Sequence, residues 1–369
     1  LELAVRDLVA TFGPRYPRGA EFLQRLAALR KEHDQPAAPP AKVARELAAR
    51  FAALRDEALL ANPLLPAKLL LVKRGQGNLG LPANYLSNSS LKPTGYDNEI
   101  ALLSPVGPGG RMTTLYRPAD GRFVGDVDLH FDAKRMLFSM PAPGGRWQVH
   151  EIGADGQGLR EIETIRQADV DNYDACYMGD DSIVFCSTAC FSGVPCVNGS
   201  GHVCNLYRRY RDGRVRQLTV EQDHDWCPTA LPNGRLLYLR WEYVDIPHAF
   251  SRILFHANPD GTEQLEYYGS GSYWPASMFF ARALPAQSTR VVAVVGGHHE
   301  LPRMGDLVVF DPSRGRGGPQ GAVQRIGARG RAVLPRAIDL PIAQSWPKFL
   351  HPFPLSDKHF LVSCRPAAR

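Results

Sequence analysis

The chain has 369 residues, of which 44% are hydrophobic and 22% charged, a composition typical of a soluble globular protein and unlike that of a disordered chain. The net charge of +6 is small for this length and the basic residues are scattered, which argues against nucleic-acid binding. No apolar run approaches the roughly 18 residues of a membrane span, so none is expected. Because the sequence begins at Leu1 without a leader peptide, we interpret its front as trimmed.

Residues 1–62 predict an N-terminal α-helical segment. Apolar residues recur at spacings of three and four in LELAVRDLVATF, EFLQRLAALRK and KVARELAARFAALRDEAL, which is the pattern of amphipathic helices. The proline-rich stretch QPAAPP at 35–40 separates the second helix from the third. We expect the three helices to pack on one another and see no catalytic pattern in them.

Residues 63–369 predict an all-β domain, because the apolar period changes to two. Short apolar or alternating runs such as RMLFSM, SIVFC, RLLYLRW and RVVAVVGG are bounded by Gly, Pro, Asn and Asp. A tight turn followed by an apolar strand recurs in FDAKRMLFSM, LPNGRLLYLRW and PLSDKHFLVSC, and Asp-Gly turns recur downstream. Each repeat is therefore expected to contain four antiparallel strands.

Repeated four-stranded antiparallel units are typical of β-propeller blades, which bury strand edges by radial repetition. We predict a mainly β fold, a β-propeller with about five visible blades behind the helical segment. The blades are expected near residues 68–120, 121–170, 171–220, 221–270 and 271–369. The last unit stops after its second strand, so we expect an incomplete ring in a sequence truncated at its C-terminus.

The repeat also predicts where a functional site lies. In an up-and-down blade, short turns fall on one face and long loops on the other, and loops held together by a rigid scaffold are where function concentrates. The polar segments 75–98, 187–204, 242–251 and 297–305 all fall on the same face as the connection 223–228. Five of the eleven histidines lie in these segments, namely His202, His224, His248, His298 and His299.

Five of the seven cysteines lie in or just before the loop 187–204: Cys176, Cys186, Cys190, Cys196 and Cys204. Their spacings do not match the paired C-x2-C of a zinc ribbon. Dense cysteines in a Gly/Ser/Pro-rich loop favour disulfides and an exported protein in an oxidising compartment. Free thiols in a cytosolic loop are the alternative.

The hexapeptide DHDWCP at 223–228 combines a repeated element with an unrepeated one. Trp226 corresponds to Trp274 and Trp346 in other repeats, which indicates packing between blades. His224 and Cys227 occur in one repeat only. Imidazole and thiolate are ligands of zinc, so one interpretation is a metal held by these two residues. One of His298 or His299 would complete that set; the other interpretation is scaffolding alone.

Known catalytic patterns are missing from the sequence. It contains no G-x-S-x-G elbow, and RGQGNLG does not follow the dinucleotide-binding pattern. The C-x-x-C-H motif of covalent haem attachment is also absent. We therefore expect no complete active site within this chain.

Several long stretches resemble a known family. STACFSGVPCVNGSGHVCNLY, DHDWCPTALPNGRLLYLRWEYVDIPH, GGHHELPRMGDLVVFDP and SWPKFLHPFPLSDKHFLVSC resemble, in this order, proteins related to the hydrazine synthase α subunit. PTALPNGRLLYL resembles a TolB-like propeller repeat. The resemblance implies a propeller middle domain, export to the periplasm or cell surface and, in hydrazine synthase itself, c-type haems with a zinc ion near one of them. A c-type haem is expected here only if a C-x-x-C-H motif lies beyond Arg369.

The function expected from the sequence is that of an exported propeller module, a scaffold or binding platform in a larger, haem-related protein. Its partner would be another protein or the rest of a multidomain chain. Two alternatives stay open. One is a fragment of a redox metalloenzyme with a metal at the loop-rich face, and the other is a TolB-like propeller that binds a peptide or protein.

Overall fold

The structure is a computed structural model that describes residues 1–34, 40–243, 251–272, 274–286, 289–297, 303–326 and 346–366. The chain divides into two compact units, each with its own buried core. Unit 1 comprises residues 1–71 and 102–113, and unit 2 comprises residues 72–101 and 114–369. The predicted sites His298 and His299 lie outside the described residues, as does His248.

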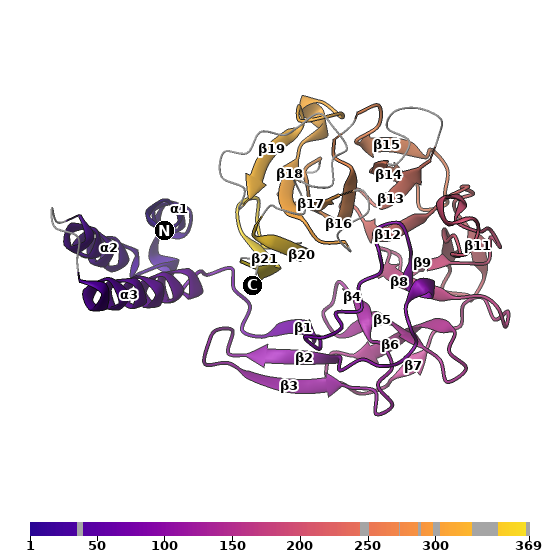
Figure 1. Cartoon of the computed structure of the whole chain (residues 1–369), viewed down its shortest axis with the longest axis horizontal. Coiled ribbons are helices and arrows are strands. Elements are labelled where there is room, and N and C mark those ends of the chain that lie inside the picture. The colour runs from indigo at the N-terminus through magenta and orange to yellow at the C-terminus, as the bar shows by residue number, and fades with distance from the viewer. Residues whose placement is uncertain are drawn as a thin grey trace. The chain divides into compact units, whose positions relative to one another are not determined.

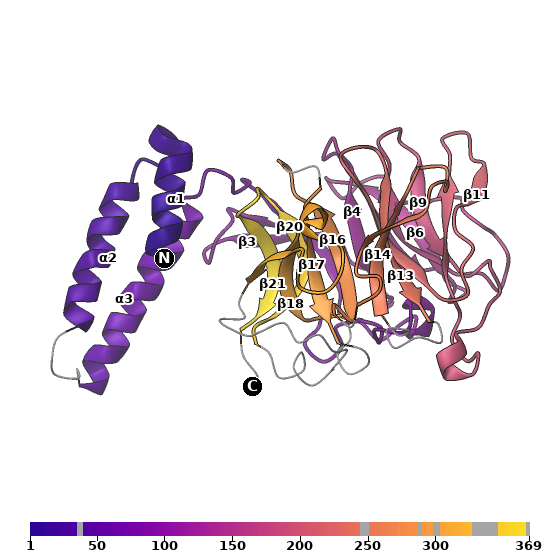
Figure 2. The same cartoon turned by 90° about the horizontal axis from the view of Figure 1, so that it is seen from above.

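Unit 1 contains the three predicted helices, α1 (Glu2–Phe12), α2 (Gly19–His33) and α3 (Ala41–Leu60), with a one-turn helix at Gly13–Arg15 (Figure 2). Their buried residues recur at helical spacing, for example Val5, Leu8 and Phe12 along α1. The Tyr16 hydroxyl donates a hydrogen bond of 2.8 Å to the carbonyl of Ala58 and so joins α3 to this core. Among the described helices, none has both the length and the apolar character needed to cross a bilayer.

The first sheet has three strands, β1 (Leu69–Lys73), β2 (Glu99–Ser104) and β3 (Arg111–Tyr116), in the order β1-β2-β3. The long segment between β1 and β2 contains a one-turn helix at Asn88–Ser90.

Two four-stranded antiparallel sheets follow, as the repeat predicts. The first consists of β4 (Gly125–Leu129), β5 (Arg135–Pro141), β6 (Trp147–Gly153) and β7 (Arg160–Glu161). The second consists of β8 (Asn172–Tyr177), β9 (Ile183–Ser187), β10 (Asn205–Arg209) and β11 (Val215–Gln217), with a one-turn helix at Pro195–Val197. Each strand pairs with the next along the chain, which confirms the meander predicted for a blade.

The next two four-stranded groups are joined into one sheet. They are β12 (Asp225–Ala230), β13 (Leu236–Glu242), β14 (Ser251–Ala257) and β15 (Leu265–Tyr268), then β16 (Ser277–Ala283), β17 (Val291–Gly296), β18 (Asp306–Phe310) and β19 (Ala322–Ile326). A single parallel pairing of Arg252 with Ser277 links them, and a one-turn helix at Pro312–Arg314 precedes β19. A final hairpin, β20 (Lys348–Pro354) with β21 (Phe360–Arg365), is separate.

In unit 2 the four-stranded groups follow one another around a common centre, with the first strand of each nearest that centre (Figure 1). These inner strands are β4, β8, β12, β16 and β20. The described residues form an open arc and do not close a ring. The fold is thus mainly β, with repeated antiparallel sheets that follow an N-terminal helical segment in the sequence.

Large aromatic side chains fill the space between neighbouring sheets. Trp147 of β6 lies between Phe123 and Tyr173 of β8, with ring centroids 4.9 and 6.3 Å away. Trp226 of β12 is fully buried, and its ring lies 6.2 Å from that of Phe279 in β16. Because such rings remove large apolar areas from water, they hold adjacent sheets together.

The two tryptophans that the sequence repeat aligns with Trp226 have different surroundings and do not occupy its place in the sheet, because Trp226 lies within β12 whereas Trp274 and Trp346 precede β16 and β20. Trp274 is buried against Phe310 of β18, with ring centroids 5.8 Å apart. Trp346 is half-buried beneath the cationic groups of Lys348 and Arg365. The contacts of Trp226 are therefore those of a residue between sheets, whereas Trp346 stacks with charged side chains.

Replacing Trp226 by alanine is expected to lower the free energy of unfolding by about 3–5 kcal/mol, because it opens a large cavity between β12 and β16. Chemical denaturation followed by circular dichroism measures the change. Val220→Ala is the matched control, since Val220 is 85% exposed and its truncation should cost less than about 0.5 kcal/mol. Equal losses in the two variants would contradict this packing role.

Candidate functional site

Every inner strand of unit 2 is interrupted by a β-bulge at the same place. The pairing register shifts within Gly125–Asp128, Tyr173–Cys176, Trp226–Thr229, Phe279–Arg282 and Leu350–Phe353. Each bulge contains one non-glycine residue with a left-handed backbone: Asp126 (φ 50°), Asp174 (49°), Cys227 (55°), Phe280 (54°) and His351 (47°). A bulge re-aims a side chain out of the regular pleat. We name these five the axial bulge residues.

The axial bulge residues contact one another in the order of their strands. The backbone N–H of Cys227 donates a hydrogen bond of 3.0 Å to Oδ2 of Asp174. The backbone of Phe280 lies close enough to the Cys227 thiol to act on its pKa, and the rings of Phe280 and His351 stand 4.1 Å apart between centroids. Asp126 is close enough to Asp174 for its charge to raise the pKa of that carboxyl. The five form one continuous arc.

The segment between β1 and β2 covers part of this arc. Asn88 Nδ2 donates to Oδ2 of Asp126 at 2.6 Å, and Asn84 Nδ2 donates to the carbonyl of Gly297 at 2.6 Å. Arg303 donates to the carbonyl of Leu86 at 2.8 Å, and its guanidinium lies over the Trp226 ring. Polar loop residues that are far apart in sequence are thus brought together near the centre of unit 2.

Burial sets the protonation states at the arc. It raises the pKa of Asp174 to about 7, with the neighbouring Asp126 carboxylate adding to the shift and Arg303 opposing it. The protein packed around the His351 ring partly desolvates the imidazole, and together with the charges of Arg74, Arg282 and Arg303 this lowers the pKa of His351 to about 3, although the side chain keeps exposed surface. Burial also raises the pKa of Cys227 well above its usual range. At neutral pH the site therefore contains a partly protonated carboxyl, a neutral imidazole and a thiol rather than a thiolate.

The axial bulge residues retain contact with solvent. Asp126, Asp174, Cys227 and Phe280 are half-buried and His351 is exposed, although all five lie on the innermost strands. Two polar groups with opposed pKa shifts and an aromatic surface are thus presented at a place that solvent reaches. Such a combination is a candidate binding site.

An ion pair crosses the centre next to the arc. Arg282 of β16 contacts Oδ1 of Asp128 on β4 at 3.2 Å and donates to the hydroxyl of Thr229 on β12 at 3.1 Å. The other oxygen of Asp128 accepts the backbone N–H of Tyr177 on β8 at 3.0 Å. Four inner strands are therefore tied together by one carboxylate and one guanidinium.

The predicted ligand His224 is fully buried just before β12. Its Nδ1 accepts the backbone N–H of Cys204 at 3.1 Å and lies 3.4 Å from the Cys204 sulfur. Its ring stands edge to face with Trp226, with centroids 4.5 Å apart. Nδ1 is thus an acceptor, whereas Nε2 is a buried nitrogen that has no hydrogen-bond partner in the described structure.

The structure does not bring the predicted metal ligands together. His224 adjoins Cys204, whereas Cys227 adjoins Asp174 and Phe280 on the arc. Within the described ranges, no group of three His, Cys, Asp or Glu side chains is arranged to hold a metal ion. The described residues therefore do not fit a zinc centre, and His298 and His299, outside those ranges, stay predictions.

The disulfides expected among Cys176, Cys186, Cys190, Cys196 and Cys204 do not form in the structure, where all seven cysteines are free. Strand register makes one pair neighbours without bonding them. Cys186 is opposite Leu206, so Cys204 is its diagonal neighbour, and the two thiols lie close enough to act on each other electrostatically. Backbone hydrogen bonds hold this loop instead, including Val194 N–H to Gly201 O at 2.8 Å.

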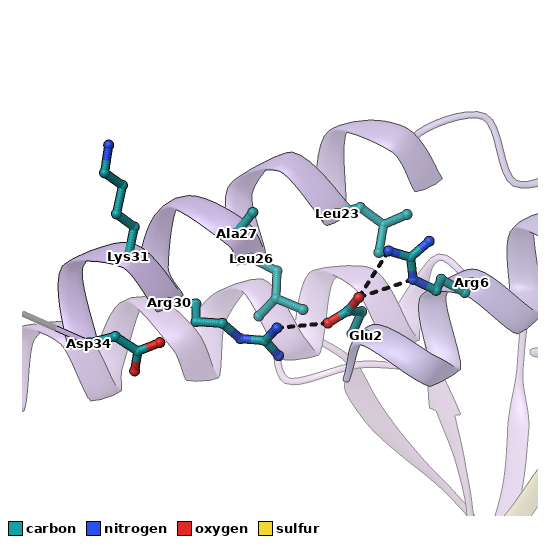
Figure 3. Close-up of a pocket in the computed structure, with 8 residues that line it drawn as sticks. All are labelled: Glu2, Arg6, Leu23, Leu26, Ala27, Arg30, Lys31 and Asp34. Carbon is teal, nitrogen blue, oxygen red and sulfur yellow. Dashed lines mark hydrogen bonds and ion pairs between the residues drawn. The ribbon is translucent and has the colours of Figure 1, made fainter.

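Apart from the arc, a pocket of about 300 Å³ lies in unit 1 between α1 and α2 (Figure 3). Glu2 pairs there with Arg6 at 2.9 Å and with Arg30 at 3.1 Å. Its carboxylate is thus already satisfied by side chains of the same unit. This pocket offers no group with a strong reason to bind a ligand.

Sequence reasoning missed the arc. Of its five residues only Cys227 was singled out, as an unrepeated thiol. The others are an ordinary aspartate, phenylalanine or histidine in an apolar strand, and no glycine marks the left-handed positions. The one shared signal is a small residue or proline directly afterwards: Val127, Ala175, Pro228, Ala281 and Pro352.

Comparison with known proteins supports the fold. No family model and no curated protein matches the chain. Among solved structures, hydrazine synthase from Kuenenia stuttgartiensis is 14% identical with a TM-score of 0.59, over 81% of this chain and 42% of that one. TolB from Acinetobacter baumannii is 14% identical with a TM-score of 0.39, over 58% of this chain and 46% of that one. A putative TolB from Agrobacterium tumefaciens is 16% identical with a TM-score of 0.43, over 65% of this chain and 76% of that one.

These likenesses concern the fold alone, because the sequence identities are low. The match to hydrazine synthase supports a propeller-like architecture, and the chain spans less than half the length of that chain. The specific resemblance to α subunit-related proteins stays a prediction.

Asp174→Asn is expected to flatten the decline of stability with pH between about pH 4 and pH 7. Because the pKa of Asp174 is raised from 3.8 to about 7 on folding, the unfolded chain loses its proton first and stability falls as pH rises through this window. One proton corresponds to a slope of up to about 1.4 kcal/mol per pH unit. Urea unfolding at pH 5, 6 and 7 measures it. Asp169→Asn, at an exposed carboxylate, should keep the wild-type slope, and a wild-type slope in both would contradict the shift.

Alkylation of the denatured protein without reductant is expected to add seven adducts, one for each free thiol. Intact mass spectrometry counts them. Fewer adducts that rise to seven after reduction would show a disulfide and overturn the free-thiol arrangement of this loop.

Proposed function

We propose that this chain is a β-propeller binding module of a larger protein, and that the axial bulge residues are its ligand site. One observation carries the proposal. Five successive inner strands repeat the same left-handed bulge, yet they place an aspartate, an aspartate, a cysteine, a phenylalanine and a histidine there. The backbone feature is a repeat, whereas the side chains are individual.

A purely structural bulge gives no reason for such side chains. Glycine adopts a left-handed backbone at no steric cost, while other residues pay about 1 kcal/mol or more. Burying a carboxyl beside a second carboxylate adds a further cost, which is visible in the raised pKa of Asp174. Proteins retain local costs of this kind chiefly at functional sites.

The chemistry of the arc favours a small organic cation. Asp126 and Asp174 repel each other, and a bound ammonium group would relieve this repulsion and lower the pKa of Asp174. The stacked rings of Phe280 and His351 offer an apolar surface further along the same arc. A ligand with an ammonium head and a short apolar tail would use both ends.

Propylammonium is the probe. We expect it to raise the melting temperature of the wild type more than sodium does at equal ionic strength and pH 7.5. In Asp126→Asn/Asp174→Asn its dissociation constant should rise at least about tenfold, because two carboxylates are lost and one ion pair is worth about 1.4 kcal/mol or more. Titration calorimetry measures this. Asp169→Asn should bind like the wild type; unchanged affinity in the double variant would disprove the site.

Proposals about the larger protein and its location in the cell have weaker support than the ligand site. The chain spans 42% of the hydrazine synthase chain it resembles, which supports a place within a larger protein. Export to the periplasm or cell surface, a c-type haem elsewhere in that protein and a TolB-like peptide partner are further proposals. They are supported by the sequence resemblance alone. Cell fractionation of the full-length protein tests the first of them.

A further inference from the structure

Unit 2 has a polar pocket of about 250 Å³, made by residues of β5 to β10 and their short turns. Four arginines and two carboxylates line it: Arg135, Arg160, Arg209, Arg211, Glu151 and Asp181. The positive charges exceed the negative ones by two. We call this the arginine pocket; it shares no residue with the axial arc.

The acceptors of the arginine pocket are already used. Glu151 accepts the Tyr177 hydroxyl on Oε1 at 2.8 Å and the Arg160 Nε on Oε2 at 2.9 Å. Oδ1 of Asp181 contacts Nε2 of His130 at 2.8 Å and Nη2 of Arg135 at 2.9 Å. Both carboxylates are thus engaged by the protein itself.

Several guanidinium N–H groups of the arginine pocket, in contrast, have no acceptor within the part of the protein that the structure describes. Arg209 is fixed by bonds from Nε to the Glu163 carbonyl at 2.8 Å and from Nη1 to the Tyr210 carbonyl at 3.3 Å, which leaves its Nη2 group for another acceptor. Arg135 Nε is buried and has no hydrogen-bond partner among the described residues. Arg211 makes no ion pair within 4 Å in the described structure, though its charge acts on Asp181.

A pocket with spare guanidinium donors and two unneutralised charges matches a dianion that presents several acceptor oxygens. Guanidinium groups bind phosphate through paired, planar hydrogen bonds. The volume is below that of pockets for drug-sized ligands, so it suits a single small group. We propose that the arginine pocket binds a phosphate group, either free or as the head of a small phosphate ester.

Sequence position explains why this site is not visible in a linear reading. Arg135 begins β5, Arg160 lies on β7, and Arg209 and Arg211 end β10 and its turn, so the four are spread over 77 positions. Scattered basic residues argue against a nucleic-acid track, which needs a continuous cationic surface. Folding gathers a few of them at one point instead.

The test compares phosphate with chloride at equal ionic strength and pH 7.5, using the full chain. We expect inorganic phosphate to raise the melting temperature above that in chloride, with saturable binding in titration calorimetry. Arg209→Gln/Arg211→Gln should weaken phosphate binding at least tenfold. Because the variant also loses the two bonds of Arg209 to backbone carbonyls, its affinity is measured at a temperature where circular dichroism shows it to be folded, and the shift caused by phosphate is taken relative to its own melting temperature in chloride. Arg214→Gln is the matched control, because Arg214 is paired with Asp212 at 2.7 Å and does not line the pocket.

Glycerol phosphate, titrated in parallel, distinguishes the two sources of the group: binding of the ester supports a phosphorylated ligand, and binding of the free ion alone supports inorganic phosphate. Equal melting temperatures in phosphate and chloride would overturn the proposal. So would unchanged affinity in the double variant. Because the axial arc lies outside the arginine pocket, these results are independent of propylammonium binding.

Discussion

One extra residue in each inner strand is the constraint on which the polar centre of unit 2 depends. A regular strand would point alternate side chains into the core and away from it. The bulge breaks this alternation, and the left-handed residue inside it turns its side chain toward the neighbouring inner strand. The hydrogen bond from Cys227 to Asp174 and the ring contact of Phe280 with His351 both follow from that turn. Without it, these polar groups would have to compete with apolar packing.

Much of the scaffold follows from periodicity. Helical spacing in residues 1–62 and two-residue spacing afterwards predicted the helices and the repeated four-stranded sheets, because both signals reflect burial of one face of an element. Trp226 is buried between sheets, but the repeat that aligned it with Trp274 and Trp346 does not match the strand positions, because only Trp226 lies within an inner strand. The joining of two sheets through Arg252 and Ser277 was not predictable, since one backbone pairing has no side-chain signature.

The site was harder to predict than the scaffold, because it depends on how two strands pair and not on the residue pattern within one strand. His224 and Cys227 are three positions apart, but an extended chain with a bulge gives them different neighbours, so closeness in sequence misled the metal interpretation. Bulges depend on how two strands pair, and nothing in a single strand such as DWCPTA specifies the shift. The cysteine loop shows the same limit, because the number of thiols in a segment does not determine which of them form a disulfide.

The contact between Arg282 and Asp128 has a consequence for how unit 2 unfolds. In most repeat folds each repeat touches only its neighbours, so an end can fray without disturbing the rest. Here a guanidinium from β16 reaches a carboxylate on β4, and the same carboxylate holds the backbone of β8. Sheets distant in sequence share one ion pair, which is an internal clasp in an arc that does not close. We expect such a contact to couple opening at either end of the arc to the centre, so that the sheets of unit 2 unfold together rather than one by one.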